Sequence, residues 1–141
     1  MHIDDLYNTD RAGISIAIIW RDEHLIEIKI TGGNGSFAGT LDTYISHGHL
    51  LKMAETIDGF PISILDKREI VFGTARCTFF CVDKVGHVMV EVSLQASTQN
   101  NFNPGSCVFN LRVEPGAIDE FVTQLRVLES GGTETAFLRS G

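Results

Sequence analysis

The chain has 141 residues, of which 43% are hydrophobic and 21% are charged. This length suits one domain, and the apolar content is too high for a disordered chain. Eleven Lys and Arg residues against eighteen Asp and Glu residues give a formal net charge of −7. Because phosphate recognition needs clustered positive charge, this balance argues against nucleic acids and anionic membrane surfaces as partners.

The sequence also predicts a compartment. Its N-terminal residues lack the basic and apolar regions of a secretory signal. The longest apolar run, residues 16–20, is far shorter than the ~20 residues that span a bilayer. Cys77, Cys81 and Cys107 are an odd number of cysteines, which indicates reduced thiols. We therefore expect a cytoplasmic protein that does not contact a membrane.

The first elements predicted are two strands. Residues 1–12 are polar and are expected to form a weakly ordered lead-in. In residues 14–20 and 26–30, apolar side chains recur at every second position, which is typical of half-buried strands. A short polar break separates the two runs, so they predict an antiparallel hairpin with one face in solvent.

The next segments predict a turn, a strand and a helix. Residues 31–36 are rich in Gly and Asn, which tolerate positive φ. Residues 37–45 fit helical spacing as well as strand propensity, and we expect a third strand because the preceding turn permits a short reversal. Residues 47–58 have one apolar helical face, and Gly59 and Pro61 mark the end of that helix.

The second half of the chain predicts strands at residues 70–72, 76–82, 88–96 and 107–113, with a polar loop at 97–105. The charged residues expected to share the solvent face and form cross-strand pairs are Glu27, Lys29, Glu91 and Arg112. The outward apolar residues Met89 and Val108 indicate that an open sheet face could self-associate.

A second helix is predicted after Glu114, because Pro115 suits a first helical turn and Gly131-Gly132 ends the apolar periodicity. Residues 131–141 are expected to be a C-terminal tail in which Phe137 and Leu138 provide a docking point.

This order of elements, with short turns between strands, predicts an α+β fold. We expect an antiparallel meander sheet of about six or seven strands, with two helices packed on one face. A single domain is expected over residues 13–130, and the sequence shows no internal repeat. The predicted core consists of Ile16, Ile18, Ile28, Ile30, Leu50, Ile57, Phe79, Val90, Val92, Phe109, Leu111, Ile118, Phe121 and Leu125.

Two histidine arrangements are the candidate sites. His47 and His49 could ligate a metal, with Asp42 within chain reach, but a helical i, i+2 spacing directs their side chains apart. Asp83 and His87 flank a tight turn, where the carboxylate could orient the imidazole. Exposed residues at a helix start and a histidine packed on a turn are the structural alternatives.

Other motifs have structural explanations. Gly33, Gly35 and Ala38 have the spacing of a dinucleotide-binding fingerprint, which needs a strand–turn–helix unit rather than the predicted hairpin. Cys77 and Cys81 would lie about 13 Å apart along one strand, too far for a disulfide. The sequence therefore assigns no catalytic residue, no metal ligand and no cofactor.

Several fragments are informative through their order along the chain: Trp20-Arg21-Asp22-Glu23, Ser36-Phe37-Ala38-Gly39, Tyr44, Gly59-Phe60-Pro61, Gly86-His87 and Glu114-Pro115-Gly116-Ala117-Ile118-Asp119-Glu120-Phe121. Together they resemble a family of small bacterial domains of unknown function, and the resemblance covers nearly the whole chain. It implies no established catalytic residue. Some similar small bacterial proteins are immunity-type partners that neutralise a toxin domain.

We therefore expect a non-catalytic binding or interaction domain, with a protein partner or a second copy of the chain as its ligand. An acidic chain is compatible with a basic toxin. The alternative is a small enzyme or metal-binding protein that uses His47 and His49, or Asp83 and His87.

Overall fold

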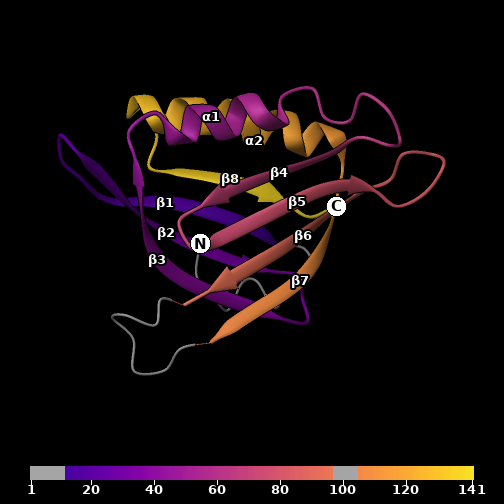
Figure 1. The fold of residues 1–141 in the computed structure, drawn as a ribbon, viewed down its shortest axis with the longest axis horizontal. Coiled ribbons are helices and arrows are strands. Elements are labelled where there is room, and N and C mark those ends of the chain that lie inside the picture. Colours follow the sequence, from indigo (N-terminus) through magenta and orange to yellow (C-terminus); the bar gives the residue numbers. More distant parts are fainter. Residues whose placement is uncertain (1–11, 97–104) are drawn as a thin grey trace.

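The computed structural model describes residues 12–96 and 105–141 (Figure 1). Within these ranges the chain forms eight strands and two helices. In chain order they are β1 (Gly13–Arg21), β2 (Leu25–Gly33), β3 (Ala38–Ser46), α1 (His49–Ile57), β4 (Lys67–Phe72), β5 (Ala75–Cys81), β6 (Val88–Gln95), β7 (Ser106–Val113), α2 (Pro115–Ser130) and β8 (Thr135–Arg139).

The strands form two four-stranded antiparallel sheets, so the prediction of a single meander sheet is wrong, although the α+β class is confirmed. One sheet has the order β3-β2-β1-β8 and the other β4-β5-β6-β7. The two sheets are separate because α1 carries the chain away from β3, after which β4 pairs with β5. Alternating apolar residues indicate that a strand has one buried face, but they do not identify its neighbours.

The helices lie beside the sheet edges rather than over one sheet face, which corrects the predicted arrangement. α1 contacts the edge strand β4, α2 contacts the edge strand β8, and the two helices pack against each other. Figure 1 shows both helices along the same side of the two sheets. Away from the helices, β3 contacts β6. The sheets approach closely there, since a Cβ at Gly32 would lie 3.0 Å from Cζ of Phe109.

Most segment predictions are confirmed. Residues 37–45, which also fitted helical spacing, form most of β3, and the helix predicted at 47–58 contains α1 with its apolar face buried. Thirteen of the fourteen predicted core residues are buried, and Ile18 is partly buried. The hydrophobic spacing therefore identified the interior, because burial of apolar area is the main driving force that selects it.

The expected C-terminal tail is corrected, because residues 131–141 contain β8. This strand pairs with β1, and Leu138 is fully buried within the core. After β8, the backbone N–H of Gly141 donates to the carbonyl oxygen of Arg112 at 2.9 Å. The predicted lead-in, except for Ala12, and nearly all of the predicted loop at 97–105 lie outside the described residues.

The chain repeats one arrangement twice, although no repeat is evident in its sequence. The unit β1-β2-β3-α1-β4 corresponds to the unit β5-β6-β7-α2-β8. In each unit three strands form a meander, a helix follows, and the last strand joins the sheet of the other unit. The registers agree as well, as shown by the cross-strand rows Ile16, Ile30 and Leu41 in one sheet and Cys77, Val92 and Phe109 in the other.

The correspondence extends into the helices. An offset of 68 positions relates Ile45 at the end of β3 to Val113 at the end of β7. The same offset relates the buried residues of α1 to those of α2, in the pairs Leu50 and Ile118, Met53 and Phe121, Ala54 and Val122, and Ile57 and Leu125. The two units therefore share packing positions rather than residue identities.

A pair of glycine substitutions tests the contact between β3 and the β4–β5 turn. Gly73 has φ +63°, and a Cβ there would lie 2.0 Å from Oγ1 of Thr43. Gly86 has φ +86° with no atom within 4 Å of such a Cβ. Gly86→Ala should cost about 1–2 kcal/mol of unfolding free energy from backbone strain alone. Gly73→Ala should cost about 2–5 kcal/mol, because overpacking adds to that strain. Equal losses in urea denaturation would contradict the contact.

Candidate functional site

His47 and His49 each connect two parts of the fold through a side-chain hydrogen bond, and we call these two residues the histidine clamps. Nε2 of His47 lies 2.5 Å from the carbonyl oxygen of Asp22, in the β1–β2 connection. Nε2 of His49 lies 2.6 Å from the carbonyl oxygen of Val71, in β4. Each ring therefore donates to backbone of a different sheet, and the two rings do not share a ligand position.

Asp83 and His87 are in contact, as the sequence analysis anticipated, within the β5–β6 turn. Oδ1 of Asp83 accepts the backbone N–H groups of Val85 and His87, both at 3.1 Å. Its Oδ2 bonds Nδ1 of His87. The hydrogen bond from the His87 side chain is the first cause that lowers the pKa of Asp83, followed by the His87 backbone N–H. The carboxylate thus organises the turn and contacts the imidazole, so this geometry fits both the candidate pair and its structural alternative.

His49 and the Asp83–His87 pair lie at opposite ends of the second sheet, whereas His47 contacts the β1–β2 connection of the first sheet. His49 reaches β4 near the β4–β5 turn, whereas Asp83 and His87 occupy the turn at the other end of β5. Among the described residues there is no group of three or more His, Cys, Asp or Glu side chains that could hold a metal ion.

The remaining sequence motifs have structural roles. Gly33, Gly35 and Ala38 belong to the β2–β3 hairpin, where the side-chain oxygen of Asn34 accepts the N–H groups of Ser36 and Phe37. The three cysteines are free, and burial raises the pKa of the Cys77 thiol. No helix in the described ranges is both long enough and apolar enough to cross a membrane.

The most prominent candidate surface is the outward face of the second sheet, which we call the open face. It consists of the outward side chains of β4–β7, which are Lys67, Glu69, Val71, Arg76, Thr78, Phe80, Met89, Glu91, Ser93, Val108, Asn110 and Arg112. Strand alternation places these side chains opposite the buried ones. No described helix or strand packs on them.

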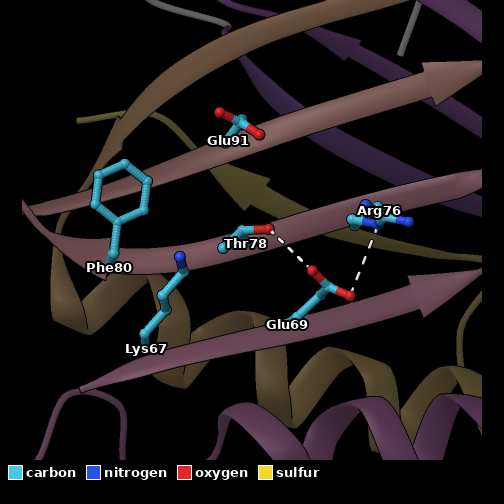
Figure 2. Close-up of a pocket in the computed structure, with 6 residues that line it drawn as sticks. All are labelled: Lys67, Glu69, Arg76, Thr78, Phe80 and Glu91. Atoms are coloured by element: carbon cyan, nitrogen blue, oxygen red, sulfur yellow. Dashed lines mark hydrogen bonds and ion pairs between the residues drawn. The ribbon is translucent and has the colours of Figure 1, made fainter.

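A shallow hollow of about 360 Å³ lies on the open face. Figure 2 shows its six lining side chains, which come from three neighbouring strands: Lys67 and Glu69 on β4, Arg76, Thr78 and Phe80 on β5, and Glu91 on β6. Charged groups of both signs therefore lie around one half-buried aromatic ring.

The charges of the hollow are only partly compensated. Nε of Arg76 lies 3.7 Å from Oε1 of Glu69, and Oγ1 of Thr78 donates to Oε2 of Glu69 at 3.5 Å. Lys67 and Glu91 make no ion pair with any residue in the described ranges. Exposed ion pairs contribute only about 0–1 kcal/mol to stability. These side chains are therefore available to bind a ligand at little cost to the fold.

The outward face of the first sheet differs in character. Its central positions are small, since Ser15 and Thr31 are buried there and Oγ1 of Thr31 lies 3.3 Å from Oγ1 of Thr40. Its charged pair, Lys29 and Asp42, is 3.9 Å apart. This face also presents large exposed side chains, since Trp20 and Tyr44 in one cross-strand row are 49% and 55% exposed. Its Lys29 and Asp42 are paired, whereas Lys67 and Glu91 of the open face have no ion pair among the described residues.

The sequence identified part of the open face. Met89, Val108, Glu91 and Arg112 were expected to face solvent, and they all do so on this sheet. The expectation that Glu27 and Lys29 share the same face is wrong, because they lie on the other sheet. The residues that β4 and β5 contribute to the hollow were not predicted, although both strands alternate in the same way.

Comparisons with protein-family models, with curated proteins and with solved structures found no match to this chain. The resemblance to small bacterial domains of unknown function therefore stays a prediction.

The histidine clamps can be tested against the metal-site alternative. His47→Ala and His49→Ala should each lower the unfolding free energy by about 0.5–1.5 kcal/mol, because each loses one hydrogen bond. His24→Ala is the control, since its exposed ring has only a 3.6 Å contact with Glu23. Urea denaturation should give the same result with zinc and with a chelator. Zinc-dependent stabilisation that both clamp variants abolish would contradict the structural role.

The carboxylate of Asp83 gives a prediction about the stability of the fold at acid pH. The pKa of Asp83 is lower in the folded state than in the unfolded state, so ionised Asp83 stabilises the fold. This stabilisation is fully present above the unfolded pKa of about 4, and it is lost as the pH falls through the folded pKa. Asp83→Asn should therefore be less stable than the parent at pH 7, and the gap should narrow below about pH 4. Denaturation at several pH values measures it, with Asp42→Asn as the matched surface control. A gap that stays constant down to pH 2 would exclude this linkage.

Proposed function

We propose that the chain is a non-catalytic binding domain that recognises a protein partner through the open face of β4–β7. One observation carries the proposal: a four-stranded face has no covering element in the described structure, and Lys67 and Glu91 lack ion-pair partners there. A stable fold does not require this array, since the buried side of the same strands already supplies the core.

The open face combines the contact types found in protein interfaces. Phe80 and Met89 are half-buried, so they provide apolar area that is already partly ordered. Val71 and Val108 are 45% and 59% exposed at the two edge strands. Charged side chains lie between these apolar groups, and interfaces of non-obligate complexes mix apolar and polar area in this manner.

The charges on the face describe the partner. Three basic residues, Lys67, Arg76 and Arg112, stand beside two acidic residues, Glu69 and Glu91. A uniformly basic partner would meet repulsion here, so we expect one with charges of both signs. The net charge of −7 can still attract a basic protein at long range, while the face sets its orientation. An immunity-type role toward a toxin domain is one form of this function.

Charge reversal at one position tests the proposal. Glu91→Lys alters the open face, and Asp42→Lys makes the same change of net charge on the outward face of the first sheet. The parent and both variants serve as bait in extracts of the producing cells. We expect one protein to be retained by the parent and by Asp42→Lys, and at least tenfold less by Glu91→Lys, with the same ranking for the purified pair.

Three results would overturn the proposal. The first is equal retention by both variants, and the second is the absence of any stoichiometric partner. The third is a concentration-dependent mass in light scattering that Glu91→Lys abolishes, because the occupant would then be a second copy. Equal urea midpoints for the two variants establish that neither change acts through unfolding.

A further inference from the structure

Three aliphatic side chains, which we call the aliphatic tip, are the most exposed large hydrophobic residues in the described chain. Leu65 is 89% exposed, Ile62 82% and Val85 78%. Ile62 and Leu65 lie in the connection between α1 and β4, and Val85 lies in the β5–β6 turn. Figure 1 shows both segments projecting at the same end of the second sheet. The connection before β4 also contacts the end of β5, since Sγ of Cys81 lies 3.8 Å from the carbonyl oxygen of Ser63.

The connection before β4 is held in shape by an ion pair that points inward. Arg68 donates from Nε and Nη2 to the two carboxylate oxygens of Asp66, at 3.2 and 2.8 Å. Its Nη1 donates to the carbonyl oxygens of Thr56 and Asp58. Oδ2 of Asp66 also accepts the N–H of Ile62 at 3.0 Å. Only 19% and 11% of the Arg68 and Asp66 side chains are exposed, so the polar groups lie inside.

In this connection the charged side chains of Asp66 and Arg68 are largely buried, while the apolar side chains of Ile62 and Leu65 are exposed. This arrangement is the reverse of the one that stabilises a fold. Burial of a Leu or Ile side chain is worth about 1.5–3 kcal/mol, and Ile62 and Leu65 forgo it. The connection is nevertheless rigid, because the Arg68 guanidinium also lies 5.4 Å from the Phe60 ring, which is buried in the core. Exposed apolar groups on a preorganised backbone have the properties of binding anchors.

The charges around the tip select its occupant. Asp66 is neutralised by Arg68, and Asp83 contacts His87. The exposed Lys67 and Lys84 have no ion pair among the described residues, so two ammonium groups flank the tip, beside the Asp83 carboxylate that His87 contacts. Contact between the tips of two copies would place like charges together.

We propose that the aliphatic tip inserts into an apolar recess, bordered by carboxylates, on a partner protein. The inference rests on the proposed function, because it assigns a second contact to the same partner. Lys67 connects the two surfaces, since it lines the hollow of the open face and begins β4 directly after the tip. The open face then sets orientation, and the tip supplies apolar anchoring.

Photo-crosslinking tests the inference. A diazirine analogue of leucine replaces Leu65, or in the control Val127, which is 38% exposed on α2. Whole extracts that retain membranes are irradiated, and adducts are identified by mass. We expect a protein adduct from position 65 and none from position 127. Its cross-linked peptide should contain apolar residues beside Asp or Glu. Lys84→Glu should reduce the adduct at least tenfold, and Lys52→Glu, an equal change on α1, should leave it unchanged.

Every other outcome overturns the inference: a lipid adduct, an adduct with a second copy of the chain, no adduct, or an adduct that Lys84→Glu does not reduce. Adding Glu91→Lys to the same probe separates the two proposals. A tip adduct that persists unchanged in Glu91→Lys contradicts the open face as the partner site while the tip stands. If retention of the partner depends on Glu91 but position 65 gives no adduct, the proposal for the aliphatic tip is contradicted and the proposal for the open face is not.

Discussion

The exchange of last strands between the two units is the constraint on which the rest of the structure depends. β4 completes the sheet that begins with β5, and β8 completes the sheet that begins with β1. The helix before each exchanged strand packs on the other helix between these edges. One unit alone would expose its inner strand face and its helix, and β8 supplies Ala136 and Leu138, both fully buried. The interior therefore forms only when both units are present, and the apolar spacing of the whole chain serves that requirement.

The repeat separates what the fold requires from what it leaves free. Equivalent inward positions are apolar in both units apart from Gly32, Gly39 and Thr43, whereas equivalent outward positions differ in charge and size. Relative to the shared register, Lys29 corresponds to Glu91, and Tyr44 corresponds to Arg112. Because packing conserves the inward positions by itself, the divergence of the outward positions reflects other demands. The proposed binding surface consists of such positions, namely the long charged side chains of β4–β7.

The spacing of apolar residues predicted most strands and both helices, but it did not predict which strands pair with each other. The difference has a physical reason. Alternation along residues 88–96 gives the buried side of β6 because side chains of a strand have a period of two. The same pattern arises whether β4 joins β3 or β5, so the division into two sheets could not be predicted. The strand β8 was missed because a run of five residues with only two inward apolar positions, Ala136 and Leu138, has little periodic signal. At the site, Glu91 and Arg112 were found from alternation, but the exposure of Ile62 and Leu65 was not. It depends on Asp66 and Arg68, whose pairing fills the interior of the connection.

The ion pair between Asp66 and Arg68 also bears on the balance between stability and the proposed function. A connection of this length could have been closed by turning Ile62 and Leu65 inward, where burial would stabilise the fold. The chain instead places a largely buried ion pair there, an arrangement that often adds nothing to stability over an apolar one. Residues that depart from the local rule of apolar burial without a gain in stability are candidates for functional positions. Arg68 neutralises Asp66, and Lys67 and Lys84 have no ion pair among the described residues beside the exposed aliphatic groups. Under the proposed function, these ammonium groups would orient an approaching partner before any apolar contact forms.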